Sequence, residues 1–85
     1  MDTIEQIRQI IEDHARLPMP VSAQSLRDRD DLYQAGMSSH ASVNVMLALE
    51  NGFDIEFPDS MLKRSVFESI DSIAVAIGEL QATAV

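Results

Sequence analysis

Two adjacent serines are the residues best placed to do chemistry in this sequence. Ser38 and Ser39 follow Gly36 and directly precede an apolar-periodic stretch that predicts a helix. A helix N-terminus carries unpaired amide N–H groups and a partial positive charge, which favour a phosphate attached to a hydroxyl there. Serine is also a preferred N-cap at any helix. From the local pattern alone, an ordinary cap is therefore the commoner interpretation of this pair.

A catalytic role for Ser39 is not favoured by its neighbours. His40 is adjacent in sequence, but successive helix residues point about 100° apart and do not face each other. The sequence has no Gly-x-Ser-x-Gly elbow, and no set of oxyanion-hole donors is evident. We therefore expect no catalytic residues in this chain and no enzyme activity of its own.

Composition narrows the remaining classes of function. The 85 residues carry a net charge of −8, which disfavours nucleic-acid binding and suits basic protein partners. The chain has no cysteine, His14 and His40 have no metal-ligand spacing, and the carboxylates do not form a calcium-binding loop pattern. We therefore expect no metal site, and one domain over residues 1–85 that is monomeric.

The location of the protein is predicted from two further absences. The first residues are too polar for a signal peptide, and no apolar run approaches the ~20 residues that span a bilayer. We therefore expect a cytoplasmic protein without membrane contacts.

Apolar spacing predicts an all-α fold of three main helices and one short helix. The first helix spans Thr3 to Ala15, with Thr3 and Gln6 as a capping box. The second spans residues 39–51, with Gly52 at the left-handed position beyond its end. Its predicted core stripe comprises Val43, Met46, Leu47, Leu49 and Phe53, and its predicted outer face comprises Ala41, Ser42, Asn44 and Asn51.

Long connections join the predicted helices. Residues 18–38 form a loop that Val21, Leu26, Leu32 and Tyr33 should pin, with one helical turn near residues 30–34. Residues 53–57 alternate in polarity but lack a second strand, so we expect an extended connection. A short helix over residues 59–64, with Met61 and Leu62 inward, and a last helix over residues 70–80, capped by Ser69, complete the chain.

The sequence resembles the acyl carrier protein family along nearly its whole length. The resemblance is carried by residues 31–40 (DLYQAGMSSH), 43–50 (VNVMLALE), 53–59 (FDIEFPD) and 67–73 (FESIDSI). Counting back from Phe53 and Leu49 places the family's attachment serine on Ser39 rather than Ser38. The resemblance implies an acyl-carrier-protein-like four-helix bundle. It also implies a 4′-phosphopantetheine arm on Ser39 whose thiol holds an acyl or aminoacyl group as a thioester.

Several residues depart from the family pattern. Ser38 and His40 stand where the family usually has Asp and Leu, and Ala41 and Asn44 stand at positions that are often acidic. Glu50 is the only acidic residue left along this helix. These departures make a housekeeping fatty-acid role doubtful. In these positions the chain resembles the small carriers that synthetase-like amino acid:carrier protein ligases load. A small amino acid such as glycine is one candidate cargo.

The resemblance also implies partners and a docking surface. The partners are a phosphopantetheinyl transferase, an acyl- or amino acid:carrier protein ligase, and downstream enzymes that accept the acyl or aminoacyl group. The expected docking residues are Met37, Ser38, His40, Ala41, Val43 and Asn44. Two alternatives stay open: a helical protein-interaction module without a prosthetic arm, and an acyl carrier for fatty-acid synthesis.

Overall fold

The computed structural model describes residues 2–15, 17 and 24–83. Every regular element within these residues is helical, which confirms the predicted all-α bundle of three long helices and one short helix. The elements are α1 (Thr3–His14), α2 (Ser39–Phe53), a 3-10 helix (Asp59–Met61), α3 (Arg64–Phe67) and α4 (Ile70–Thr83). None of the helices in the described part of the chain is long and apolar enough to cross a membrane.

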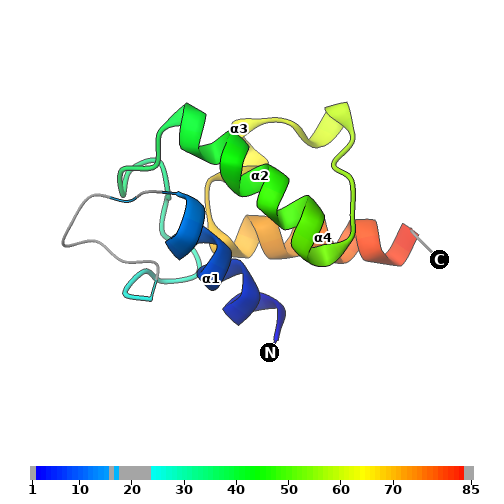
Figure 1. Cartoon of the computed structure of the whole chain (residues 1–85), viewed down its shortest axis with the longest axis horizontal. Coiled ribbons are helices and arrows are strands. Elements are labelled where there is room, and N and C mark those ends of the chain that lie inside the picture. The colour runs from blue at the N-terminus through cyan, green and yellow to red at the C-terminus, as the bar shows by residue number, and fades with distance from the viewer. Residues whose placement is uncertain (1, 16, 18–23, 84–85) are drawn as a thin grey trace.

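The core lies where α1 packs against both α2 and α4, while α3 packs against α4 (Figure 1). Ile7 and Ile11 of α1 are fully buried there, as the apolar spacing predicted. Burial of one such side chain contributes roughly 1.5–3 kcal/mol. The fully buried large side chains that they meet come from the loop, α2 and α4, and are Leu32, Val45, Leu49, Ile70, Ile73 and Ile77.

The predicted cap of α1 is wrong by one residue. Asp2, not Thr3, is the N-cap, and its carboxylate accepts a 2.9 Å hydrogen bond from the backbone N–H of Glu5. Gln6 does not close a capping box, because its side-chain amide donates to the carbonyl of Gly52 at 3.1 Å. The glutamine therefore links α1 to α2 instead of completing the first turn of its own helix.

The end of α2 also differs from the prediction. Gly52 lies inside the helix, and the left-handed residue is Asp54 with φ 55°. A Cβ on Gly52 would lie 3.3 Å from Cδ1 of Ile10, so this glycine permits the close approach of α1 and α2. Asp is tolerated in the left-handed region better than most residues, because its short side chain can hydrogen-bond locally.

The buried stripe of α2 is shifted from the predicted one. Ala41, Val45 and Leu49 are buried, at the i, i+4 and i+8 spacing of one helix face. Val43 and Leu47 are instead 49% and 53% exposed. The helix carries apolar residues on more than one face, so periodicity alone could not decide which face would be buried in the core.

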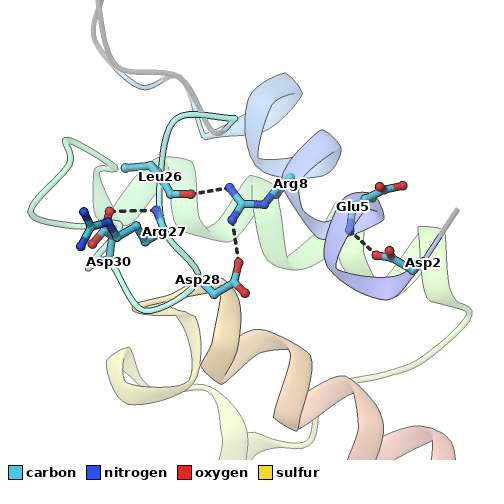
Figure 2. A network of polar contacts seen from close by, with 7 residues as sticks. All are labelled: Asp2, Glu5, Arg8, Leu26, Arg27, Asp28 and Asp30. Atoms are coloured by element: carbon cyan, nitrogen blue, oxygen red, sulfur yellow. Dashed lines mark hydrogen bonds and ion pairs between the residues drawn. The ribbon is translucent and has the colours of Figure 1, made fainter.

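The long connection is held by hydrogen bonds from both sides. The Arg8 guanidinium donates to the Leu26 carbonyl and pairs with the Asp28 carboxylate, both at 2.6 Å (Figure 2). The Asp28 carbonyl in turn accepts from the N–H of Asp71, at the start of α4, at 2.8 Å. The loop is therefore joined to α1 through the Arg8 side chain and to α4 through its own backbone carbonyl at Asp28.

The predicted pins of this loop have mixed outcomes. Leu32 is buried as expected, and its N–H donates to the Glu68 carbonyl at 2.6 Å. Leu26 and Tyr33 pack partly buried against the core. Val21 lies outside the described residues. Residues 32–36 form hydrogen-bonded turns rather than a helix.

The segment after α2 is extended, as predicted, and buries Phe57. The single short helix predicted over residues 59–64 is instead a 3-10 helix followed by the separate helix α3. Leu62 lies between them and is 46% exposed, so its predicted inward position is wrong. The Phe57 and Phe67 rings meet edge to face with centroids 5.2 Å apart, which packs α3 against the extended segment.

Candidate functional site

Ser38 is the N-cap of α2. Its Oγ accepts a 3.0 Å hydrogen bond from the N–H of Ala41, and its carbonyl accepts from the N–H of Ser42 at 2.9 Å. Its backbone is extended, as an N-cap requires. The cap therefore uses the Ser38 hydroxyl to satisfy an amide that has no partner within the helix.

Ser39 is the first residue of α2 and is exposed. Within the described part of the chain, its hydroxyl has no hydrogen-bond partner, whereas its carbonyl accepts from Oγ of Ser42 at 2.7 Å. The first amides of a helix also have no intrahelical acceptor. An anion attached to this hydroxyl would therefore meet the positive end of the α2 dipole, a contribution of about 0.3–1 kcal/mol at an exposed site.

A tight turn brings the chain to these serines. Gly36 has φ 119°, a value that residues with a Cβ rarely adopt. Its N–H donates to the Tyr33 carbonyl, and the N–H of Met37 donates to the Leu32 carbonyl at 3.0 Å. Met37 then enters the core with only 3% of its surface exposed, which anchors the start of α2 from below.

An open groove of about 400 Å³ adjoins Ser39. Its walls come from α2, from α3 and the two residues before it, and from the loop before α2. The lining residues are Tyr33, Ser39, Ser42, Val43, Met46, Leu62, Lys63, Arg64 and Phe67. Apart from Lys63 and Arg64, they are apolar, aromatic or hydroxyl-bearing, so the groove combines an apolar floor with cationic charge.

The expected docking residues divide by burial. Ser38, His40 and Val43 are exposed, and Val43 lines the groove together with Ser39. Asn44 is half-buried and lines a separate hollow between α1 and α2. Met37 and Ala41 are 3% and 4% exposed, and their expected surface position is wrong. Both side chains are needed to fill the core beneath the first turn of α2.

Sequence reasoning missed the α3 side of the site. Lys63 and Arg64 are the only cationic residues after Arg29 in the chain, a signal that could have marked them. Phe67 comes from a segment far from Ser39 in sequence and reaches the groove only through the fold, whereas Tyr33 lies in the loop just before α2. Across the described residues, no cluster of three or more His, Asp or Glu side chains could hold a metal ion.

The comparison with protein families assigns a family to this chain. A family model described as "Phosphopantetheine attachment site" matches residues 5–77. The chain belongs to this phosphopantetheine-binding family. Its cofactor is therefore phosphopantetheine, carried covalently on a serine. The exposed and unengaged hydroxyl of Ser39 fits such an attachment, since the modifying enzyme must reach it.

Individual relatives agree with this assignment. The chain is 51% identical over 67 residues, which are 79% of this chain and 78% of the relative, to the "Aminoacyl carrier protein" of Agrobacterium fabrum. The family and this relative show a carrier rather than an enzyme, as expected from the sequence.

Two solved structures share the fold along almost the whole chain. One is the crystal structure of an engineered Bradyrhizobium japonicum glycine:[carrier protein] ligase complexed with carrier protein from Agrobacterium tumefaciens and ATP. The match there has a TM-score of 0.86 and 41% identity and covers 92% of this chain and 99% of that chain. The other is a solution structure of an Agrobacterium tumefaciens protein, with a TM-score of 0.75, 40% identity and 95% of each chain covered.

Proposed function

We propose that Ser39 carries the 4′-phosphopantetheine arm and that the arm's thiol holds an aminoacyl group as a thioester. The observation that carries the choice of serine is the bond from the Ala41 N–H to Oγ of Ser38. That bond gives Ser38 a structural task and leaves the Ser39 hydroxyl exposed and unengaged within the described residues. A modifying enzyme can reach Ser39 without breaking the cap of α2.

The aminoacyl cargo is supported by the relatives. The Agrobacterium fabrum relative is named an aminoacyl carrier protein. The crystallised carrier that this chain resembles is bound to a glycine:[carrier protein] ligase. A separate ligase of that kind would activate the amino acid and transfer it to the arm of this chain, with glycine as the first amino acid to try.

The exposed residues near Ser39 would form the surface that docks onto partner enzymes. His40 and Val43 are exposed near Ser39 on α2 and would contact the phosphopantetheinyl transferase, the ligase and the downstream acceptor enzymes. Asn44 is half-buried on the side of α2 that faces α1, so it would contribute only at the margin of this surface. Met37 and Ala41 would act indirectly, by holding the first turn of α2 from the core. A cytoplasmic location, expected from the sequence, is part of this proposal.

Intact-mass spectrometry after co-expression with a phosphopantetheinyl transferase tests the attachment. The wild-type chain and Ser38→Ala should gain the mass of one arm, whereas Ser39→Ala should gain none. Fragmentation of the modified chain should place the added mass on Ser39. An arm found on Ser38, or no addition with several transferases, would contradict the proposal.

A loading assay tests the cargo. The holo chain is offered to an amino acid:carrier protein ligase with ATP and a panel of amino acids, and in parallel to a fatty acyl synthetase with long-chain acids. We expect an aminoacyl thioester with a small amino acid, which hydroxylamine releases. Loading by long acyl chains alone would instead support an acyl carrier for fatty-acid synthesis.

A further inference from the structure

The groove beside Ser39 has a charge opposite to that of the whole protein. The chain has a net charge of −8, yet none of the nine lining residues is acidic and two, Lys63 and Arg64, are cationic. The ion pair found in the described part of the chain joins Arg8 to Asp28, and it includes neither Lys63 nor Arg64. Among the described residues, neither Lys63 nor Arg64 therefore forms an ion pair with a carboxylate.

Arg64 is exposed but stacks over an aromatic ring of the same groove. Its guanidinium carbon lies 4.3 Å from the centroid of the Tyr33 ring. The backbone N–H of Tyr33 donates to the Asp31 carboxylate at 2.8 Å, and its side chain packs partly buried against the core. Stacking on a ring face leaves the N–H groups at the edge of the guanidinium free to bind an anion.

We propose that Lys63 and Arg64 bind the phosphodiester of the arm, and that the adjoining part of the arm lies in the groove. This inference rests on the proposed attachment at Ser39. The phosphate is bonded directly to the Ser39 oxygen, so it must lie at the edge of a groove that this residue lines. Guanidinium and ammonium groups form their strongest hydrogen bonds with such anions.

The apolar floor of the groove would contact the part of the arm that follows the phosphate. The pantetheine chain carries a gem-dimethyl group close to its phosphate, and Val43, Met46 and Leu62 offer apolar surface inside the groove. Val43 and Leu62 are each about half exposed, at 49% and 46%, so covering them would remove apolar surface from water.

The same charge excludes the far end of a loaded arm. An aminoacyl thioester carries an α-ammonium group, which the positive charge of Lys63 and Arg64 repels. The thiol and its cargo therefore stay outside the groove and accessible to the enzymes that load and unload them. The groove thus acts as an anchor for the proximal part of the arm and not as a pocket for the cargo.

Methyl and ³¹P NMR on the full-length apo, holo and glycyl-loaded chain test the anchor. The methyl resonances of Val43, Met46 and Leu62 should shift between apo and holo, while the exposed Val75 of α4 should not. Loading with glycine should add no further shift at these groove methyls. Unshifted groove methyls in the holo chain, or new shifts on glycine loading, would overturn the inference.

Charge variants separate the anchor from general electrostatics. Lys63→Gln combined with Arg64→Gln should abolish the holo-specific methyl shifts and the salt dependence of the ³¹P resonance. Arg29→Gln is exposed, lies outside the groove and also removes one positive charge, so it should leave both unchanged. Lys63→Arg retains the charge and should retain both signals.

The outcomes distinguish this inference from the function on which it rests. Equal holo shifts and equal ³¹P behaviour in the wild type and the Lys63→Gln, Arg64→Gln chain would overturn the anchor while leaving the carrier function intact. The mass of every variant is measured first. A chain that never gains the arm on Ser39 would instead remove the basis of both proposals.

Discussion

The Oγ of Ser38 accepts a 3.0 Å hydrogen bond from the backbone N–H of Ala41. Two neighbouring hydroxyls at the same helix start thereby acquire different tasks. Ser38 stabilises the first turn of α2, and Ser39, one residue further on, presents its hydroxyl outward beside the groove. The chemistry proposed for Ser39 depends on this division.

Removal of the cap should lower stability without removing the attachment site. We expect Ser38→Ala to cost about 0.5–2 kcal/mol, because one amide of α2 loses its acceptor. For a domain of this size, each kcal/mol lowers Tm by roughly 4–8 °C. Ser38→Asp should retain most of the stability, since Asp is also a good N-cap. A Ser39→Ala loss as large as that of Ser38→Ala, measured by thermal unfolding, would contradict the division of tasks.

Glu50 should prove to be a structural residue. Its Oε2 accepts a 2.8 Å hydrogen bond from the N–H of Phe57, and its carbonyl accepts from the N–H of Ile55 at 3.0 Å. We expect Glu50→Ala to cost about 1–2 kcal/mol in urea unfolding, because the Phe57 amide would lose a charged acceptor. Glu56→Ala, at an exposed site in the same segment, should change stability by less than about 0.5 kcal/mol. Equal effects of the two changes would argue against this role.

Arg8 should control the order of the long loop. Arg8→Gln cannot reproduce both the bond to the Leu26 carbonyl and the ion pair with Asp28. The Arg8 side chain is 16% exposed, so the bonds are partly shielded from water. We expect faster amide hydrogen exchange at Asp71, whose N–H binds the Asp28 carbonyl, with smaller changes inside α2.

The Arg29→Gln chain is the matched control for this loop. Arg29 is an exposed residue of the same loop, and its replacement removes the same charge. It should leave the exchange rate of Asp71 unchanged. If both variants accelerate exchange alike, the net charge rather than the Arg8 contacts would hold the loop.

Two helical glycines should respond differently to alanine. A Cβ on Gly78 of α4 would meet no atom within 4 Å, so Gly78→Ala should stabilise the protein by about 0.5–1 kcal/mol through backbone entropy. A Cβ on Gly52 would lie 3.3 Å from Cδ1 of Ile10, which would oppose the same gain. We therefore expect Gly52→Ala to be less stabilising than Gly78→Ala in thermal unfolding. A larger gain at Gly52 would show that α1 moves away freely.

Val43 should matter for partners rather than for folding. It is 49% exposed on α2 beside Ser39. We expect Val43→Asp to reduce the rate of ligase loading about tenfold or more, if the contact contributes ~1.4 kcal/mol, with little change in Tm. Val75→Asp alters a similarly exposed valine on α4 and should load normally. Equal loading of the two variants would place the docking surface elsewhere.

Much of the fold was accessible from the sequence because its signals are local. The apolar spacing located the three long helices, and Ser69 caps α4 as expected, accepting from the N–H of Ser72 at 3.0 Å. The errors arose at helix ends where two neighbouring residues were both suitable for the same position. Asp2 replaced Thr3 as a cap, and Asp54 replaced Gly52 as the left-handed residue. Such choices depend on the neighbouring helix and not on the segment itself.

The sequence by itself determined the family, the helical class and the pair of serines that carries the chemistry, since these depend on residue types and spacing within individual segments of the chain. The tertiary structure decided which face of α2 is buried: α2 packs against α1, and Ala41 is buried while Val43 is exposed. It also brought Lys63 and Arg64 to the groove at Ser39, across more than twenty residues of chain. A shared groove between α2 and α3 exists only once both helices have packed, so local sequence could not reveal it.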